Sequence, residues 1–257
     1  MESFDPCADP VVQSLLAEAH ADQDVLGLIL CGSLGAGAAH PESDYDVCFV
    51  VTDAAFARYT AEGREPERGA GAQTVRKKDL WHIAAGGFTP ERLPEWAIPG
   101  YGEGRVLLDK TGEVMRLHAA LRHKPETGAR AEIEGAYDAY LNILYRSLKA
   151  WRRGNELGAR LQAAEQAHLL LALLFILERR WRPYHDRLWL HLESLAVQGW
   201  RPGELRATLL DLIATGHPPR QQQIARHVIS LLDERGYGNI YEAWNGEIDE
   251  VLGWTFE

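Results

Sequence analysis

The first half of the chain alternates between helical and strand-like hydrophobic patterns. Residues 10–21 carry apolar side chains at helical spacing, which predicts a short helix. Continuous apolar runs at residues 25–31 and 46–52 predict two buried strands, because a strand covered on both faces does not need polar alternation. Residues 75–84 mix β-branched and aromatic side chains and predict a third strand, and residues 105–109 predict a fourth.

The second half of the chain has helical periodicity from about Thr127 onward. One apolar stripe at spacings of three and four residues consists of Ile133, Tyr137, Tyr140, Leu144, Leu148 and Trp151. A second predicted stripe consists of Leu157, Leu161, Ala164, His168, Leu171 and Phe175. Further helical patterns occupy residues 202–214, 218–235 and 238–254. We therefore expect an α+β protein: an N-terminal α/β domain with a mixed sheet at residues 1–124, followed by a C-terminal helical bundle at residues 125–257.

Composition narrows the class of protein. The chain of 257 residues is 46% hydrophobic and 25% charged, which is typical of a folded globular protein. A formal net charge of -10 argues against a nucleic-acid partner, since phosphates require a basic face. No apolar run reaches the ~18 residues of a membrane span, so no membrane partner is expected. Three cysteines without metal-ligand spacing favour a cytoplasmic protein without disulfides.

The chemistry is concentrated in residues 30–50, LCGSLGAGAAHPESDYDVCFV. Gly32 and Ser33 open a turn of small residues where the first strand ends. Asp44 and Asp46 lie at the start of the next strand, and residues two apart on a strand point to the same face. Two carboxylates beside exposed backbone N–H groups suit a Mg²⁺ ion that shares its ligands with a phosphate.

A Gly-Ser pair followed ten residues later by Asp-x-Asp, between two apolar strands, resembles the signature of the nucleotidyltransferase superfamily typified by DNA polymerase β. The closer resemblance is to the small antibiotic-modifying branch, the aminoglycoside and lincosamide nucleotidyltransferases. Residues 25–52 carry most of it, and the order of an α/β domain before a helical domain is also similar. The alternative interpretation of these residues alone is an acidic surface turn.

The resemblance implies a third carboxylate on a neighbouring strand, which completes the metal site and helps to deprotonate the attacking hydroxyl. Asp79 comes at the expected place in the chain and is the favoured candidate. Asp109 is the rival, but it precedes Lys-Thr-Gly and has the context of a turn or helix cap. Spacing alone does not decide between these two residues.

The helical half offers a candidate general base. Glu165 lies four residues after Leu161 and three before His168, at the edge of the predicted stripe. The resemblance implies a catalytic role there, because some aminoglycoside nucleotidyltransferases use a glutamate of the helical domain as the base. The alternative is a surface carboxylate paired with Arg160 or Arg130.

Two sets of basic residues are candidates for binding the triphosphate. Lys149 belongs to the first, at the end of a long predicted helix, where basic residues also complement the helix dipole. Arg187 belongs to the second, in the segment WRPYHDRL. In related helical domains, a Pro-Tyr segment of this kind often ends in a basic residue that contacts phosphate.

The resemblance therefore implies Mg²⁺-dependent transfer of NMP from ATP or another NTP to a hydroxyl group, with release of pyrophosphate. Two Mg²⁺ ions would be held by Asp44, Asp46 and Asp79. The acceptor would be a small hydroxylated molecule, and the acidic balance suits a cationic one such as an aminoglycoside. A catalytically inactive or antitoxin-like regulatory protein, and a protein AMP-transferase, remain alternatives. Both a monomer and a homodimer are compatible with the sequence.

Overall fold

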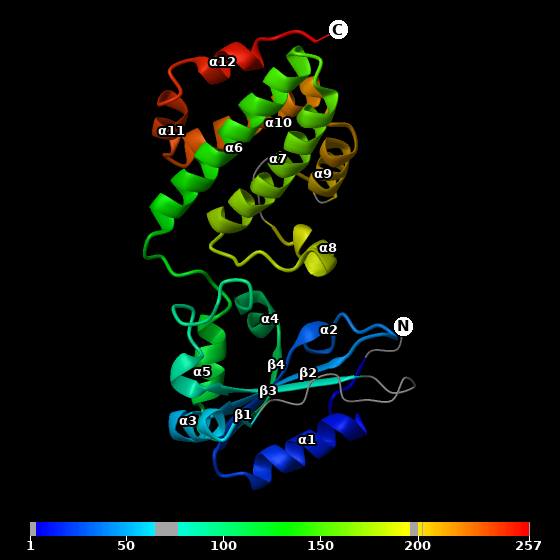
Figure 1. Ribbon diagram of the computed structural model, residues 1–257, viewed down its shortest axis with the longest axis vertical. Helices are drawn as coiled ribbons and strands as arrows, with labels where there is room; N and C mark the ends of the chain where they lie inside the picture. Colours follow the sequence, from blue (N-terminus) through cyan, green and yellow to red (C-terminus); the bar gives the residue numbers. More distant parts are fainter. Residues whose placement is uncertain (1–3, 65–76, 196–199, 202, 257) are drawn as a thin grey trace. The chain divides into compact units, whose positions relative to one another are not determined.

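The computed structural model describes residues 4–64, 77–195, 200–201 and 203–256. The chain divides into two compact units, Met1–Lys124 and Pro125–Glu257, and Figure 1 shows the elements of each. The first unit contains the sheet, and the second is built from helices. The expected α+β class is confirmed.

The N-terminal unit is organised around a four-stranded mixed sheet with the strand order β3-β2-β1-β4. Strand β1 is antiparallel to β2 and β4, and β2 is parallel to β3. The elements of this unit are α1 (Pro10–Ala21), β1 (Val25–Leu30), α2 (Gly32–Gly35), β2 (Tyr45–Val51), α3 (Asp53–Ala61), β3 (Lys78–Ala84), a 3-10 turn (Ala85–Gly87), α4 (Ile98–Gly102), β4 (Arg105–Asp109) and α5 (Glu113–Ala120).

The predicted helix and strands of this unit are confirmed with small shifts at their ends. The third strand begins at Lys78, and residues 75 and 76 of the predicted strand lie outside the described residues. Helix α1 begins at Pro10 because Asp9 caps it, with Oδ1 accepting hydrogen bonds from the N–H groups of Val11 and Val12. Asp9 Oδ2 also accepts a 2.8 Å hydrogen bond from the hydroxyl of Tyr45, which fixes one face of β2 against α1.

The C-terminal unit consists of helices of very different length. Helices α6 and α7 are its longest, and α7 packs on α6 and α9. The elements are α6 (Ala129–Arg152), α7 (Glu156–Leu177), a 3-10 turn (His185–Arg187), α8 (Leu188–Leu192), α9 (Glu204–Thr215), α10 (Pro218–Glu234), α11 (Gly238–Glu242) and α12 (Glu247–Leu252). The pattern at residues 238–254 is therefore two short helices, and residue 202 of the pattern at 202–214 is not described.

The predicted stripe of α6 is confirmed, whereas the stripe predicted for α7 is wrong in the first half of that helix; the last two residues of the stripe, Leu171 and Phe175, are buried in the core. Leu157 and Leu161 are exposed by 72% and 64%, and His168 is exposed as well. The buried face of the first half of α7 carries small residues, among them Ala163 and Ala167. A Cβ atom added to Gly216 would lie 2.9 Å from the Cβ of Ala163, so α9 ends too close to α7 for a larger side chain.

Helix α7 is also the one helix of the described ranges with the length and apolar composition of a membrane span. Its apolar residues from Leu170 to Phe175 belong to the core of the C-terminal unit, together with buried residues of α6, α9 and α10. A core helix of a soluble protein meets the same two criteria. The length and composition of α7 are thus weak grounds for a membrane span.

Candidate active site

The Gly-Ser turn lies directly against Asp46, the second aspartate of the Asp-x-Asp pattern. The N–H of Cys31 donates a 2.7 Å hydrogen bond to the carbonyl of Asp46. Gly32 follows with a φ of +62°, and a Cβ at this position would lie 1.9 Å from Asp46 Oδ2. Glycine is therefore required twice here, by the backbone angle and by the carboxylate that occupies the space of a side chain.

Asp46 and Asp79 are register partners on the parallel strands β2 and β3, and the next pair on this face is Cys48 with Trp81. Paired residues of adjacent strands point to the same face of a sheet. Tyr45, one residue before Asp46, points to the opposite face, where its hydroxyl is bonded at the start of α1. The two carboxylates therefore share the face opposite α1, and both are half-buried.

Asp44 lies one residue before β2 begins. Its Oδ1 accepts a 3.3 Å hydrogen bond from the N–H of Lys77, at the start of β3. The beginning of β3 therefore contacts both aspartates of the pattern: Lys77 bonds to Asp44, and Asp79 is paired with Asp46. Among the described residues, no group of three His, Cys, Asp or Glu side chains is arranged to hold a metal ion.

A buried hydroxyl that the sequence analysis did not single out fixes Ser33. The side chain of Ser43 is 2% exposed. The Ser33 hydroxyl donates a 2.6 Å hydrogen bond to Ser43 Oγ, which also accepts one from the N–H of His40 at 2.9 Å. The only sign of this role in the sequence is the position of Ser43 immediately before Asp44. Its burial depends on how the segment between β1 and β2 folds, which the sequence pattern does not show.

Aromatic side chains continue the same face of the sheet beyond the carboxylates. Trp81 donates a 2.9 Å hydrogen bond from Nε1 to the hydroxyl of Tyr101, and Phe88 packs edge-on against Tyr101 at 5.3 Å. Cys48 is completely buried beside Trp81, and this burial raises the pKa of its thiol well above the ordinary value. These uncharged residues lie next to the two carboxylates on the same face of the sheet.

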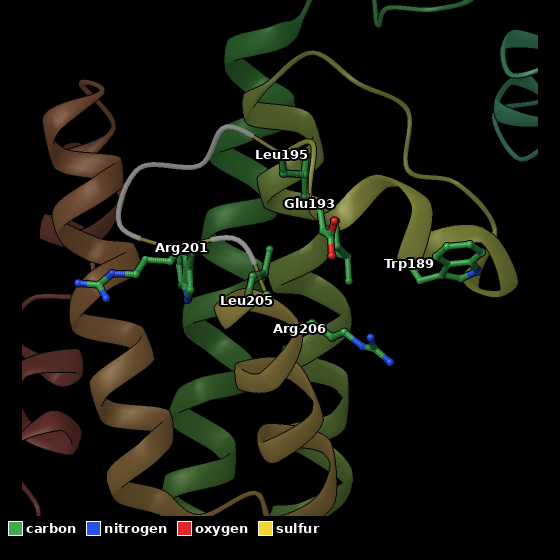
Figure 2. Close-up of a pocket in the computed structure, with 9 residues that line it drawn as sticks. Trp189, Glu193, Leu195, Arg201, Leu205 and Arg206 are labelled. Atoms are coloured by element: carbon green, nitrogen blue, oxygen red, sulfur yellow. The ribbon is translucent and has the colours of Figure 1, made fainter.

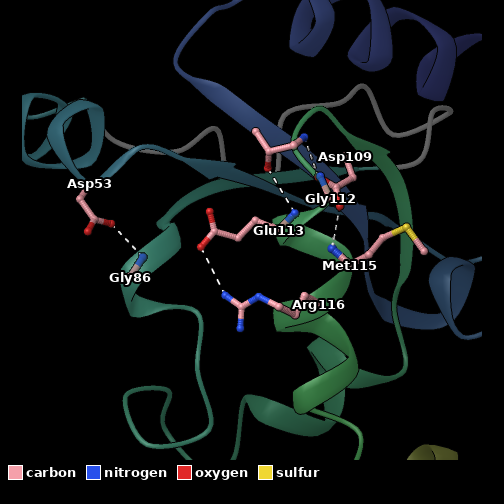
Figure 3. A network of polar contacts seen from close by, with 8 residues as sticks. Asp53, Gly86, Asp109, Gly112, Glu113, Met115 and Arg116 are labelled. Atoms are coloured by element: carbon pink, nitrogen blue, oxygen red, sulfur yellow. Dashed lines mark hydrogen bonds and ion pairs between the residues drawn. The ribbon is translucent and has the colours of Figure 1, made fainter.

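Asp109 does not belong to this constellation. β1 is antiparallel to β2 and β4, so Asp109, paired with Gly27, lies at the end of the sheet away from Asp46. Its carboxylate accepts hydrogen bonds from the N–H groups of Thr111, Gly112 and Met115, and Figure 3 shows the last two of these residues beside it. Burial raises its pKa, but these backbone bonds outweigh that effect and hold the pKa below its ordinary value. The expected role as a turn or helix cap is confirmed.

Glu165 is an exposed residue on α7. The two arginines considered as its partners bind other carboxylates: Arg160 pairs with Glu156 at 2.6 Å, and Arg130 pairs with Glu134 at 2.9 Å. A cluster of basic side chains around His168, one turn further along α7, lies near Glu165 instead of the expected Arg160 or Arg130.

That cluster contains His168, Arg182 and His185. Arg182 Nη1 lies 3.0 Å from the ring nitrogens of His168, and the two histidine rings are 5.7 Å apart in an edge-on arrangement. Burial lowers the pKa of His168, the charges of Arg182 and His185 lower it further, and Glu165 acts in the opposite direction. Glu165 thus borders a basic cluster.

The structure does not bring Lys149 and Arg187 together. Lys149 Nζ lies 3.1 Å from the hydroxyl of Tyr145 and above its ring. Arg187 lies above the ring of Tyr184, in the segment that carries Arg182. The two basic sets therefore have separate aromatic partners.

The distance between the two basic sets, measured along the helices, can be estimated from one contact. Ser147 donates a 2.9 Å hydrogen bond to the carbonyl of Ala159, which places the end of α6 beside the start of α7. His168, the neighbour of the second set, is nine residues further along α7, or about 13 Å at 1.5 Å per residue. The two basic sets therefore lie at different positions along the length of α7.

A small cleft of about 90 Å³ is also present in the C-terminal unit (Figure 2). It lies between α8 and the start of α9, with Trp189 and Leu205 among its apolar residues. Glu193, Arg201 and Arg206 supply charges of both signs. None of the predicted site residues lines this cleft.

Comparisons with known proteins complete the description. Residues 91–190 match a family described as a domain of unknown function (DUF4037). No curated protein matches the chain. The structure is similar to the crystal structure of a nucleotidyltransferase-like protein from Exiguobacterium sibiricum 255-15, with 14% identity and a TM-score of 0.41. The similarity covers 90% of this chain and 89% of the other. Values this low do not transfer an activity from one chain to the other.

Proposed function

We propose that the protein is a Mg²⁺-dependent nucleotidyltransferase, which moves NMP from ATP or another NTP to a hydroxyl of a small molecule and releases pyrophosphate. The observation that carries this proposal is the contact between Gly32 and the Asp46 carboxylate, with Asp79 as the register partner of Asp46. A glycine-bearing turn, two paired carboxylates and a hydroxyl fixed by a buried serine lie together at one end of the sheet.

The chemistry of Asp44, Asp46 and Asp79 suits Mg²⁺, although within the described residues the three carboxylates do not already converge on one point. Carboxylate oxygens are the ligands that this ion prefers, and it commonly shares them with substrate phosphates. Asp46 and Asp79 would hold the metal from adjacent strands, and Asp44 would complete the set from the start of β2. When bound, Mg²⁺ would neutralise charge on the phosphoryl group being transferred.

The protein side chains would act on the other parts of the substrates. The backbone N–H of Gly32 and the Ser33 hydroxyl would bind the outer phosphates, with the Ser33–Ser43 hydrogen bond then reversed so that Ser43 donates and Ser33 is able to donate to phosphate. The acceptor oxygen would form its bond to the α-phosphorus while the bond from that phosphorus to pyrophosphate breaks. The acceptor proton would go to a carboxylate, either Asp79 or Glu165. Lys149 or Arg187, from the C-terminal unit, would add positive charge to the triphosphate.

The acceptor class is the finer part of the proposal. The net charge of -10 favours a cationic acceptor in the encounter, because opposite charge steers association. An aminoglycoside fits that description, and a lincosamide is the second choice from the sequence resemblance. If either is the acceptor, nucleotide transfer would inactivate the antibiotic.

Nucleotide binding tests the proposal directly. Calorimetric titration with ATP and with GTP, in Mg²⁺ and in EDTA, is carried out on the wild type and on the Asp44→Asn/Asp46→Asn double variant. We expect binding that requires Mg²⁺ and weakens at least about tenfold in the variant, since two of the metal-binding charges are removed. Glu113→Gln is the matched control, because Glu113 is exposed and pairs with Arg116. Equal affinity in the wild type and the double variant would contradict the proposal.

Turnover with candidate acceptors then separates the alternatives. Mass spectrometry should detect an NMP adduct on an aminoglycoside or a lincosamide incubated with ATP, Mg²⁺ and the protein. Nucleotide binding without any adduct would favour the inactive regulatory alternative. An adduct on added protein instead of the small molecule would favour a protein AMP-transferase.

A further inference from the structure

A cleft of about 410 Å³ lies in the N-terminal unit between the start of β4 and one face of α5. Its walls include Val106 of β4 and Met115 and Ala119 of α5, which give it an apolar side. Two arginines, Arg105 and Arg122, also line it, and both are exposed. The residues that line the cleft include no aspartate or glutamate, although the chain carries 37 acidic residues against 27 lysines and arginines.

The two arginines of the cleft differ from many arginines elsewhere in the chain. Arg58, Arg116 and Arg160 each form an ion pair with an aspartate or glutamate, at 2.5 Å, 3.4 Å and 2.6 Å respectively. Within the described ranges, neither Arg105 nor Arg122 forms an ion pair with a carboxylate. Their positive charges are therefore available to a ligand, in a protein whose overall charge is negative.

A buried histidine, His118, lines the same cleft as Arg122. His118 is 4% exposed, and its Nε2 lies 3.0 Å from the carbonyl of Tyr101. Burial lowers the pKa of His118 and the nearby Arg122 guanidinium lowers it further, whereas hydrogen bonds to the carbonyls of Tyr101 and Gly104 act in the opposite direction. His118 thus ties the turn before β4 to α5, and the arginines supply the charge of the cleft.

The cleft lies at the same end of the sheet as the candidate active site. Arg105 is paired with Leu30 on β1, and Leu30 is paired with Val47, the residue after Asp46. Helix α2 joins the two places: Gly32, at its start, contacts the Asp46 carboxylate, and Gly35, at its end, lines the cleft. Four residues of helix span about 6 Å, so one small molecule can extend from one place to the other.

We propose that this cleft binds an oxyanion, a phosphate or carboxylate group, carried by one of the substrates of the candidate active site. The guanidinium groups of Arg105 and Arg122 bind the oxyanion, because arginine donates paired, charge-assisted hydrogen bonds to such groups. The apolar side formed by Val106, Met115 and Ala119 accommodates the carbon skeleton next to it. The assignment to a substrate rests on the proposed function, but the presence of an oxyanion site does not.

Inorganic phosphate and pyrophosphate are the probes for this site. Each is titrated by calorimetry, in EDTA and at low salt, into the wild type, the Arg105→Gln/Arg122→Gln double variant and Arg116→Gln. Arg116 is the matched control, because it lies on α5 but pairs with Glu113 outside the cleft. We expect the dissociation constant to rise about tenfold or more in the double variant and to stay unchanged in the control. No binding to the wild type, or equal binding by all three proteins, would overturn the proposal.

The same titrations distinguish this inference from the proposed function. Asp46→Asn should retain phosphate binding in EDTA, because the cleft needs no metal. If phosphate binds and depends on the two arginines while Mg²⁺-nucleotides do not bind, the oxyanion site stands and the nucleotidyltransferase proposal fails. If both bind, competition identifies the source: ATP displaces phosphate when the cleft holds a nucleotide phosphate, and both bind together when it holds an acceptor group.

Discussion

The two units of the chain place their polar chemistry differently. In the N-terminal unit, the predicted site residues lie where backbone segments approach closely, as Gly32 does against the Asp46 carboxylate. In the C-terminal unit, the interior is a large apolar cluster built from α6, α7, α9 and α10, and the predicted site residue Glu165 is on the surface. Both units have an apolar core, but a small change of backbone should disturb the predicted site in the first unit, whereas a loss of apolar volume in the second should lower stability without involving a predicted site residue.

The two units also differ in how individual polar side chains are hydrogen-bonded. In the N-terminal unit, Asp9 and Asp109 each accept at least two backbone N–H bonds, so their charge is used to end or begin an element. In the C-terminal unit, the hydroxyl of Tyr137 is buried without a hydrogen-bond partner among the described residues. Loss of the charge at Asp9 or Asp109 should therefore lower stability, whereas loss of the Tyr137 hydroxyl should be nearly free.

The largest expected effect is on the apolar core of the C-terminal unit. Leu144→Ala removes a side chain that is fully buried in this cluster and should lower the free energy of unfolding by about 2–5 kcal/mol. Denaturant unfolding followed by circular dichroism measures it.

Leu161→Ala is the matched control for this change. Leu161 belongs to the predicted stripe of α7 but is 64% exposed, so its truncation should cost about 0.5 kcal/mol or less. A control as destabilising as Leu144→Ala would show that the exposed face of α7 is covered, and the contrast between the two positions would fail.

The second effect tests the close backbone approach in the N-terminal unit. Gly32→Ala places a Cβ 1.9 Å from Asp46 Oδ2 at a φ of +62°, so it should lower the free energy of unfolding by about 2–3 kcal/mol. It should also weaken Mg²⁺-dependent nucleotide binding, because the carboxylate must move.

Gly37→Ala separates backbone strain from this contact. Gly37 also has a positive φ, of 72°, but an added Cβ would meet nothing within 4 Å. Its replacement should therefore cost only about 1 kcal/mol and leave nucleotide binding unchanged. Equal effects of the two substitutions, measured by unfolding and by calorimetry, would exclude a special role for the contact with Asp46.

The fold was predicted correctly where the hydrophobic pattern of the sequence allowed only one type of element or one buried face. The continuous apolar runs of β1 and β2 and the stripe of α6 are confirmed within one or two residues. The face of α7 was wrong because its second half, from Leu169 to Leu177, is apolar on all sides. The first half of α7 instead packs through small residues such as Ala163, which lies close to Gly216 at the end of α9. This contact is visible only in the structure.

The candidate site was predictable in its motif and not in its surroundings. The spacing of Gly32 and Asp46 was sufficient to suggest the turn and the strand, but not that the carboxylate fills the place of a Cβ. The pairing of Asp46 with Asp79 depends on the register between two strands separated by a long connection, which no local pattern encodes. Ser43 and Arg105 escaped notice because their roles depend on burial and on the absence of a partner, both of which are three-dimensional properties.

A smaller effect concerns the cap at Asp109. Asp109→Asn keeps the shape of the side chain but removes its charge, and should lower stability at neutral pH by about 1 kcal/mol or less, since the carboxylate is only partly buried and solvent screens its charge. The pKa is lowered in the folded state, so the contribution is present above the ordinary value of 3.8 and is lost as the pH falls through the folded value. Unfolding curves of the two proteins should therefore converge at pH values below the lowered folded pKa of Asp109. A constant difference down to those pH values would contradict the charge-based explanation.

The smallest effect is expected at Tyr137, and it reverses the usual sign. Burial raises the pKa of its hydroxyl, and that group has no hydrogen-bond partner within the described residues, so Tyr137→Phe removes a buried polar atom and little else. The free energy of unfolding should stay within about 1 kcal/mol of the wild type or rise slightly. Ser147→Ala provides the contrast, because the Ser147 hydroxyl donates a buried 2.9 Å hydrogen bond to Ala159, and its loss should cost about 1 kcal/mol. If Tyr137→Phe were the more destabilising of the two, the Tyr137 hydroxyl would have to be hydrogen-bonded in solution, and the contrast with the bonded hydroxyl of Ser147 on the same helix would fail.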